Sequence, residues 1–341
     1  MPFREQVLDV DAAVVRRLDE AGAVLIAKLT LGALAWGDVW FGGRTRNPWQ
    51  PSQGSSGSSA GSASAVAAGA VPFAIGSETL GSIVSPSDRC GCSSLRPSFG
   101  RVSRAGAMAL SWSMDKLGPI CRSATDAAIV FAAIEGADPR DPGTRNGSLG
   151  FATRPSVDGL TVGILASAYE DNEAYAAVID QLEALGAQAV PVEVPDYPVG
   201  EMTFVLNAEA ATAFDDLTRD GRDDLLVRQE ERAWPNVFRA SRLVPAVEYL
   251  RANRLRVRLL KRLEGTLREV DVLCHPSFAA GLLTATNLTG HPAVVVPCGF
   301  REDGTPFSVS FTARLDADDV LLDVVRAWQA VTDHHRRHPD L

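Results

Sequence analysis

Residues 54–86, GSSGSSAGSASAVAAGAVPFAIGSETLGSIVSP, contain two turns rich in serine and glycine, centred on residues 57–61 and 77–83. Small and apolar residues join the turns, and they predict a helix over residues 62–70 and a strand over residues 71–75. A flexible glycine–serine linker would not embed AVAAGAVPFAI between its two halves. A phosphate-binding P-loop is excluded because no Gly-Lys-Ser/Thr follows the glycines. The stretch therefore predicts two structured turns on either side of a helix and a strand.

The second turn has the groups that a nucleophilic serine requires. A serine hydroxyl is a poor nucleophile at neutral pH and needs a base within hydrogen-bond distance. The residues before Ser82 are Thr79, Leu80 and Gly81, and their successive backbone N–H groups can hold a developing oxyanion. Ser58 lies in the first turn, where the glycines allow strained backbone geometry. Ser82 and Ser58 are therefore the candidate catalytic residues.

This stretch resembles the signature of the amidase signature family, whose members cleave carboxamides with a Ser–cis-Ser–Lys triad. The family pattern runs Gly-Gly-Ser-Ser-Gly-Gly-Ser, then a small-residue helix, then Gly-Thr-Asp-Thr-Gly-Gly-Ser-Ile-Arg, and residues 57–84 follow it. The resemblance continues at Pro86 and at residues 90–91, 95–97, 100–103, 115–119 and 287–293. It covers most of the chain and is weakest over residues 195–270.

The resemblance implies a role for each serine. Ser82 would be the nucleophile, and Ser58, which would follow a cis peptide bond, would relay the proton. The backbone N–H groups of residues 79–82 would form the oxyanion hole. The implied reaction is acyl transfer from an amide to Ser82, release of ammonia or an amine, and hydrolysis of the acyl-enzyme. Leu80 replaces the usual first glycine of the turn and Val84 the usual arginine, and both replacements make the pocket entrance more apolar.

The family's catalytic lysine lies in a Gly-Ile-Pro-x-x-x-Lys-Asp segment that precedes an AGAVL unit. Here AGAVL begins at residue 21, and the chain has only three lysines, Lys28, Lys116 and Lys261. We interpret Lys28 as a strand-end residue, Lys116 as a structural turn residue and Lys261 as a surface residue. Three explanations stay open: a start assigned too late, a degraded or non-catalytic relative, or Lys28 or another group as a substitute base. We expect this 341-residue form to be a poor catalyst and to expose apolar surface and a sheet edge.

Alternating helical and extended patterns predict the fold class. Predicted strands cover residues 23–29, 71–75, 160–165, 187–194, 270–274, 293–297 and 307–311, and predicted helices cover residues 9–21, 62–70, 123–134, 173–185, 318–331 and most of 202–263. Residues 36–57 have no periodicity and predict a long loop. We expect an α/β fold in which a mixed central β-sheet is covered by helices on both faces, as an N-terminally truncated, amidase-signature-like α/β/α sandwich.

We expect residues 1–341 to form a single amidase domain. Its parts would be a signature core at about 20–135, a variable pocket-forming region at about 195–270, and C-terminal strands and a helix at about 270–332. The variable region offers the following candidate pocket walls, for each of which core packing is the more ordinary role: Phe204, Phe214, Trp234, Phe238 and Tyr249. The arginine-rich residues 239–268 predict an amphipathic helix with a solvated basic face.

Composition limits the partners. A net charge of −9 argues against nucleic acid and anionic membranes. Five cysteines, an odd number, indicate free thiols in a reducing compartment, and no signal peptide is visible. We therefore expect a cytoplasmic protein that needs no cofactor or metal and acts on a small-molecule amide, with homo-oligomerisation left open.

Two alternatives to an active amidase also stay open. One is a non-catalytic protein with the amidase fold, and the other is the glutaminase subunit of a tRNA-dependent amidotransferase. A histidine-based serine hydrolase is disfavoured because His275 and His291 each precede a proline and are interpreted as turn residues. The Gly-x-Ser-x-Gly elbow of α/β-hydrolases also fits poorly.

Overall fold

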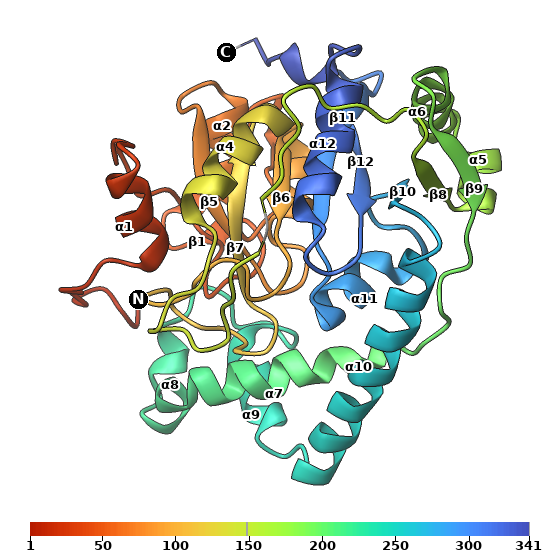
Figure 1. Cartoon of the computed structure of the whole chain (residues 1–341). Coiled ribbons are helices and arrows are strands. Elements are labelled where there is room, and N and C mark those ends of the chain that lie inside the picture. Colours follow the sequence, from red (N-terminus) through yellow and green to blue (C-terminus); the bar gives the residue numbers. More distant parts are fainter. Residues whose placement is uncertain (148, 341) are drawn as a thin grey trace.

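The computed structural model describes residues 1–147 and 149–340, and an eight-stranded sheet lies at its centre (Figure 1). In spatial order its strands are β5 (Phe73–Glu78), β7 (Lys116–Cys121), β6 (Ser93–Arg96), β11 (Ala293–Phe300), β12 (Pro306–Thr312), β10 (Val272–Pro276), β8 (Thr161–Ile164) and β9 (Gln188–Pro191). The pairs from β5 to β10 are antiparallel, and β10–β8–β9 are parallel. The predicted mixed sheet is therefore confirmed.

Helices cover both faces of this sheet, as predicted. One face packs against α4 (Ala124–Ile134), α6 (Glu173–Ala184) and α12 (Asp318–Gln329). The other face packs against α2 (Ala60–Ala67), α3 (Val84–Cys90), part of α10 (Ala246–Leu267) and α11 (Leu282–Thr289). Side chains alternate between the faces of a strand, which explains why Leu117 and Ile120 of β7 lie in different apolar clusters.

The remaining elements form the rim of the molecule. They are α1 (Ala13–Glu20), α5 (Ala166–Asp171), α7 (Phe204–Ala213), α8 (Asp215–Arg219), α9 (Trp234–Ser241), and the short strands β1 (Val39–Trp40), β2 (Gly43–Arg44), β3 (Arg46–Asn47) and β4 (Gln50–Gly54). Helices α7 to α10 form a layer below the sheet in Figure 1, with a second apolar cluster of their own. The predicted loop over residues 36–57 is wrong in detail, because β1–β2 and β3–β4 form two antiparallel pairs within it.

The predicted strand over residues 23–29 is also wrong. The structure assigns no strand there, and Val24, Leu25 and Ile26 are 67–82% exposed. Among the described residues, no strand pairs with this segment. At the sheet's nearby edge, Ser62 Oγ donates to the Ile75 carbonyl and Ser59 Oγ bonds both backbone groups of Ser77, so side chains of α2 and its N-cap already occupy outer positions of β5. The apolar run is present in the sequence, but a strand also needs a free partner.

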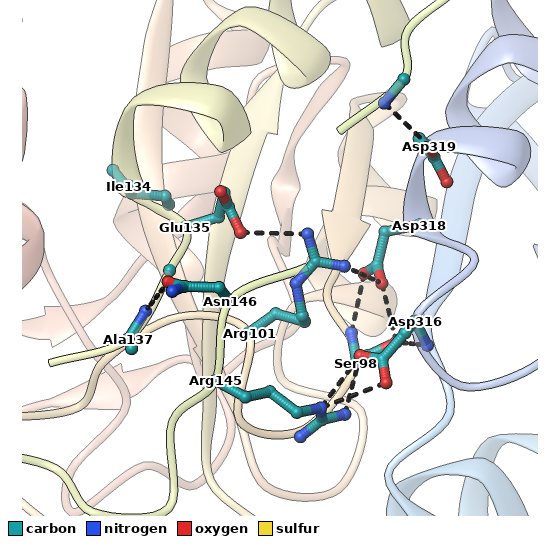
Figure 2. A network of polar contacts seen from close by, with 12 residues as sticks. Ser98, Arg101, Ile134, Glu135, Ala137, Arg145, Asn146, Asp316, Asp318 and Asp319 are labelled. Carbon is teal, nitrogen blue, oxygen red and sulfur yellow. Dashed lines mark hydrogen bonds and ion pairs between the residues drawn. The ribbon is translucent and has the colours of Figure 1, made fainter. Parts of the chain in front are cut away.

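A buried ion-pair network joins the N-terminal and C-terminal parts of the sheet region (Figure 2). The Asp318 carboxylate, at the start of α12, accepts hydrogen bonds from the Ser98 backbone N–H and Oγ, both at 2.8 Å. The Arg101 guanidinium lies 3.4 Å from Asp318 and 3.0 Å from Glu135. Arg101 and Asp318 are fully buried, so each charge depends on the other for compensation.

Candidate active site

The two serine turns meet at the end of β5. The backbone N–H of Ser59 donates to the Ser82 carbonyl at 3.1 Å, and the Gly57–Ser58 peptide bond is cis, as the resemblance implies. Ser58 is fully buried, and its Oγ has no hydrogen-bond partner among the described residues. Ser82 borders a cavity of about 530 Å³. The structure thus brings the two candidate catalytic serines together.

Two glycines allow the turns to approach this closely. A Cβ on Gly57 would lie 1.9 Å from the carbonyl oxygen of Gly37, so no larger residue fits there without moving the backbone. Gly81 has φ +94°, a conformation that L side chains rarely adopt. These two positions explain why the sequence places glycine immediately before each candidate serine.

A buried carboxylate supports the second turn from below. Glu78 Oε2 accepts the backbone N–H groups of Ile83 at 2.7 Å and Val84 at 2.9 Å. Glu78 Oε1 accepts Arg96 Nη1 at 2.9 Å and Asn287 Nδ2 at 2.7 Å. Burial favours the neutral acid, but the Arg96 charge and these hydrogen bonds outweigh it, so the pKa of Glu78 is lowered. Glu78 is therefore charged at neutral pH and fixes the start of α3.

The backbone donors next to Ser82 remain available for a ligand. No described residue accepts a hydrogen bond from the N–H groups of Thr79, Leu80, Gly81 or Ser82. Their neighbours Ile83 and Val84, in contrast, are held by the Glu78 carboxylate. The arrangement provides unsatisfied N–H groups next to a serine hydroxyl, which is the requirement for an oxyanion hole.

A second carboxylate fixes the outer side of the turn. Asp115 accepts the Thr79 Oγ1 hydroxyl at 2.6 Å and the backbone N–H groups of Leu110 and Ser111 at 2.8 and 2.9 Å. Ser111 Oγ in turn donates to the buried Glu209 carboxylate at 2.6 Å. The loop over residues 110–115 is thus tied both to the nucleophile turn and to α7.

The cavity beside Ser82 is mainly aromatic and aliphatic. Its walls include Trp36, Leu80, Leu206, Trp234 and Val237. The Trp36 and Trp234 rings pack edge-on with centroids 5.5 Å apart, and Trp234 Nε1 donates to the Leu34 carbonyl at 2.8 Å. This pocket can surround a large apolar group attached to a carbonyl carbon near Ser82.

Of the predicted aromatic walls, only Trp234 lines this cavity. Phe214 and Phe238 are buried in the second apolar cluster. Tyr249 lines a different cavity, and Phe204 lines another. The interpretation of His275 as a turn residue is wrong, because it lies within β10 and is buried.

The described part of the chain places no lysine in the cavity of Ser82. Lys28 is exposed and borders a separate apolar cavity together with Leu31 and Phe41. Lys261 is exposed on α10. Lys116 is buried at the start of β7 and donates to the Met114 carbonyl, so it is not a turn residue. Among the described residues, no group of three His, Cys, Asp or Glu side chains is placed to hold a metal ion.

The Lys116 amine makes a testable contribution to stability. Burial, together with the nearby Arg96 charge, lowers the pKa of Lys116 to about 7 from its ordinary value of 10.5. Between these two values the unfolded chain binds a proton that the folded chain lacks, so stability rises with pH by up to about 1.4 kcal/mol per unit. We expect Lys116→Met to remove this rise in urea unfolding at pH 7, 8 and 9. Lys261→Met should keep it, and an unchanged slope in Lys116→Met would refute the assignment.

Sequence patterns did not identify the residues that support the turn. Arg96 and Asn287 lie inside stretches that resemble the family, yet nothing in their spacing linked them to Glu78. The available indication was a carboxylate between an apolar strand and the serine turn, since a charge at such a position requires a partner.

Comparisons with known proteins agree with this fold and site. The family model described as Amidase matches residues 3–286. A glutamyl-tRNA(Gln) amidotransferase subunit of Moorella thermoacetica is 33% identical over 382 aligned residues, which cover 97% of this chain and 78% of the relative. Native peptide amidase from Stenotrophomonas maltophilia superposes with a TM-score of 0.82 at 29% identity, covering 94% of this chain and 76% of that one. An amidase family protein from Bacillus anthracis superposes with a TM-score of 0.85 at 25% identity, covering 100% and 74%.

The fold and the serine pocket define an enzyme that hydrolyses amide bonds. The chain belongs to the amidase family. In the described part of the chain, no helix is both long and apolar enough to span a bilayer.

Proposed function

We propose that the chain hydrolyses small carboxamides through an acyl-enzyme on Ser82. The observation that carries this proposal is the position of Ser82, which lies at an apolar cavity, beside four successive backbone N–H groups without a described acceptor, and against the Ser58 turn. Ser82 Oγ attacks the amide carbon, the N–H groups of residues 79–82 hold the oxyanion, and the C–N bond breaks to release ammonia or an amine. Water then hydrolyses the Ser82 ester and regenerates the hydroxyl.

Ser58 is the proposed proton relay for this reaction. Its buried Oγ, without a partner among the described residues, is free to bond a reacting group or a base. Lys28, the candidate substitute base, borders a different cavity, which weakens its case. Because no lysine lines the described cavity of Ser82, we expect turnover by this chain to be slow, since a triad without its base loses several orders of magnitude in rate.

The cavity suggests the substrate class. Trp36, Leu206 and Trp234 favour carboxamides with an aromatic or large aliphatic acyl group. The second candidate function, as the glutaminase component of an amidotransferase, is favoured by the relatives named as glutamyl-tRNA(Gln) amidotransferase subunits. The two are distinguished by comparing ammonia release from a primary aromatic amide with ammonia release from glutamine.

The experiment that tests the proposal is labelling of the purified chain with a fluorophosphonate. We expect labelling of the unaltered chain and of Ser52→Ala, a substitution at an exposed serine of β4, and no labelling of Ser82→Ala. Labelling that persists in Ser82→Ala would place the nucleophile elsewhere. A chain that is folded by circular dichroism but is not labelled would contradict an activated serine and favour the non-catalytic alternative.

Buried free cysteines suit a reducing compartment. Cys90, Cys92, Cys121 and Cys274 are buried and unpaired in the structure, and we propose a cytoplasmic protein on this basis.

A further inference from the structure

Helix α10 has apolar residues on two sides. Leu259, Leu263 and Leu267 are buried against the body of the molecule. A second set, which we name the outer stripe, consists of Leu243, just before the helix, and Val247, Leu250 and Val257, and these side chains are 53–82% exposed. Leu243, Val247 and Leu250 belonged to the single apolar side predicted from sequence, and the structure instead leaves them in solvent.

The outer stripe has the spacing of a helix-packing seam. Its members are separated by steps of four, three and seven residues, a spacing that keeps them on one side of a helix. Arg254, exposed between Leu250 and Val257, continues the same line. Figure 1 shows α10 at the border of the molecule, with its first turns extending away from the sheet.

The charges around the outer stripe have one sign. Helix α10 contains six basic and two acidic residues, whereas the whole chain has a net charge of −9. Arg256 points inward and donates to the Leu288 carbonyl at 2.9 Å, and Arg251 pairs with Glu248 at 3.1 Å. The other cations, Arg254, Arg258, Lys261 and Arg262, form no ion pair with a described residue.

We propose that the outer stripe docks an acidic amphipathic helix of a different protein. The apolar side of that helix would cover the stripe, and its flanking carboxylates would neutralise the four free cations. A second copy of this chain fits poorly, because it would bring Arg254 and Arg258 against the same cations. Nucleic acid fits poorly as well, because phosphates have no use for Leu250 and Val257.

The proposal is tested with a synthetic peptide as the probe. The peptide is a helix of about 21 residues, enough to span α10, with leucines at alternating three- and four-residue spacing and glutamates on both flanks, and its binding to the full chain is followed by fluorescence anisotropy. We expect saturable binding that weakens at high salt and is at least about tenfold weaker for a matched peptide with lysine in place of glutamate. Leu250→Glu should weaken binding at least about tenfold. Ile129→Glu, a change at a 66% exposed residue of α4, should not.

Several results would overturn the proposal. These are absence of saturable binding, equal binding of the two peptides, or unchanged binding by Leu250→Glu. A concentration-dependent dimer in light scattering that Leu250→Glu abolishes would assign the stripe to a second copy. Binding of single-stranded RNA or anionic vesicles, lost in Arg254→Glu, without binding of the acidic peptide would assign it to a polyanion. Circular dichroism checks that each variant is folded, and fluorophosphonate labelling of Ser82 is read separately, so the proposed activity and this surface can fail independently.

Discussion

Glu78→Gln is expected to lower the free energy of unfolding by about 3–5 kcal/mol, because it leaves a buried guanidinium without its counter-charge. Arg96 and Glu78 are both fully buried, and their charged groups lie 2.9 Å apart. The same carboxylate accepts the N–H groups of Ile83 and Val84, so a glutamine must also turn its amide away from one set of donors. The change is measured by urea unfolding followed through tryptophan fluorescence.

The effect on the turn is separated from the effect on stability by labelling Ser82 under conditions where each variant is folded. Glu78→Asp keeps the charge but is one methylene shorter, so we expect a smaller loss of stability and a clearly reduced labelling rate. Glu302→Gln, at an exposed position, is the matched control and should change stability by less than about 0.5 kcal/mol. A similarly small change in Glu78→Gln would show that this carboxylate does not hold the turn.

Asp318→Asn is the second substitution with a large expected effect, a loss of about 3 kcal/mol in the free energy of unfolding. Asp318 is fully buried, accepts two hydrogen bonds from Ser98 and lies 3.4 Å from Arg101 (Figure 2). Arg101 keeps its contact with Glu135 at 3.0 Å in the variant, so we place the loss at the lower end of the range for a broken buried pair.

The neighbouring Asp319 offers a control for this substitution. It accepts the Gly150 backbone N–H at 3.0 Å near the surface and has no arginine partner among the described residues. Asp319→Asn should therefore cost less than about 1 kcal/mol. Equal losses for the two substitutions in thermal or urea unfolding would mean that the buried ion pair adds nothing beyond its hydrogen bonds.

Local sequence patterns were sufficient for the elements that are stabilised by their own neighbours. The helix over 124–134 begins where Ser123 Oγ accepts the Asp126 N–H at 3.1 Å, as the capping pattern predicts. The strand–helix–strand unit over 160–194 is present as β8, α6 and β9. The two serine turns were located because glycine and serine at those positions have a local conformational reason.

The features that the sequence did not predict depend on contacts distant along the chain. Asn287 reaches Glu78 across a separation of 209 residues, and no spacing rule relates the two. The failure at residues 23–29 has the same origin, because a local pattern describes one strand but not whether another strand lies beside it. The cavity walls were missed similarly, since Trp36 meets Trp234 only after α9 has packed.

Different atoms hold the turn before α3 and face the cavity. Glu78 grips the backbone N–H groups of Ile83 and Val84, whereas the side chain of Leu80 borders the cavity. A backbone grip is indifferent to the identity of the side chain that it holds. Substitution at position 80 can therefore alter which molecules enter the cavity while the nucleophile keeps its place. An ancestral turn supported in this way could diversify in substrate preference one residue at a time, without passing through unfolded intermediates.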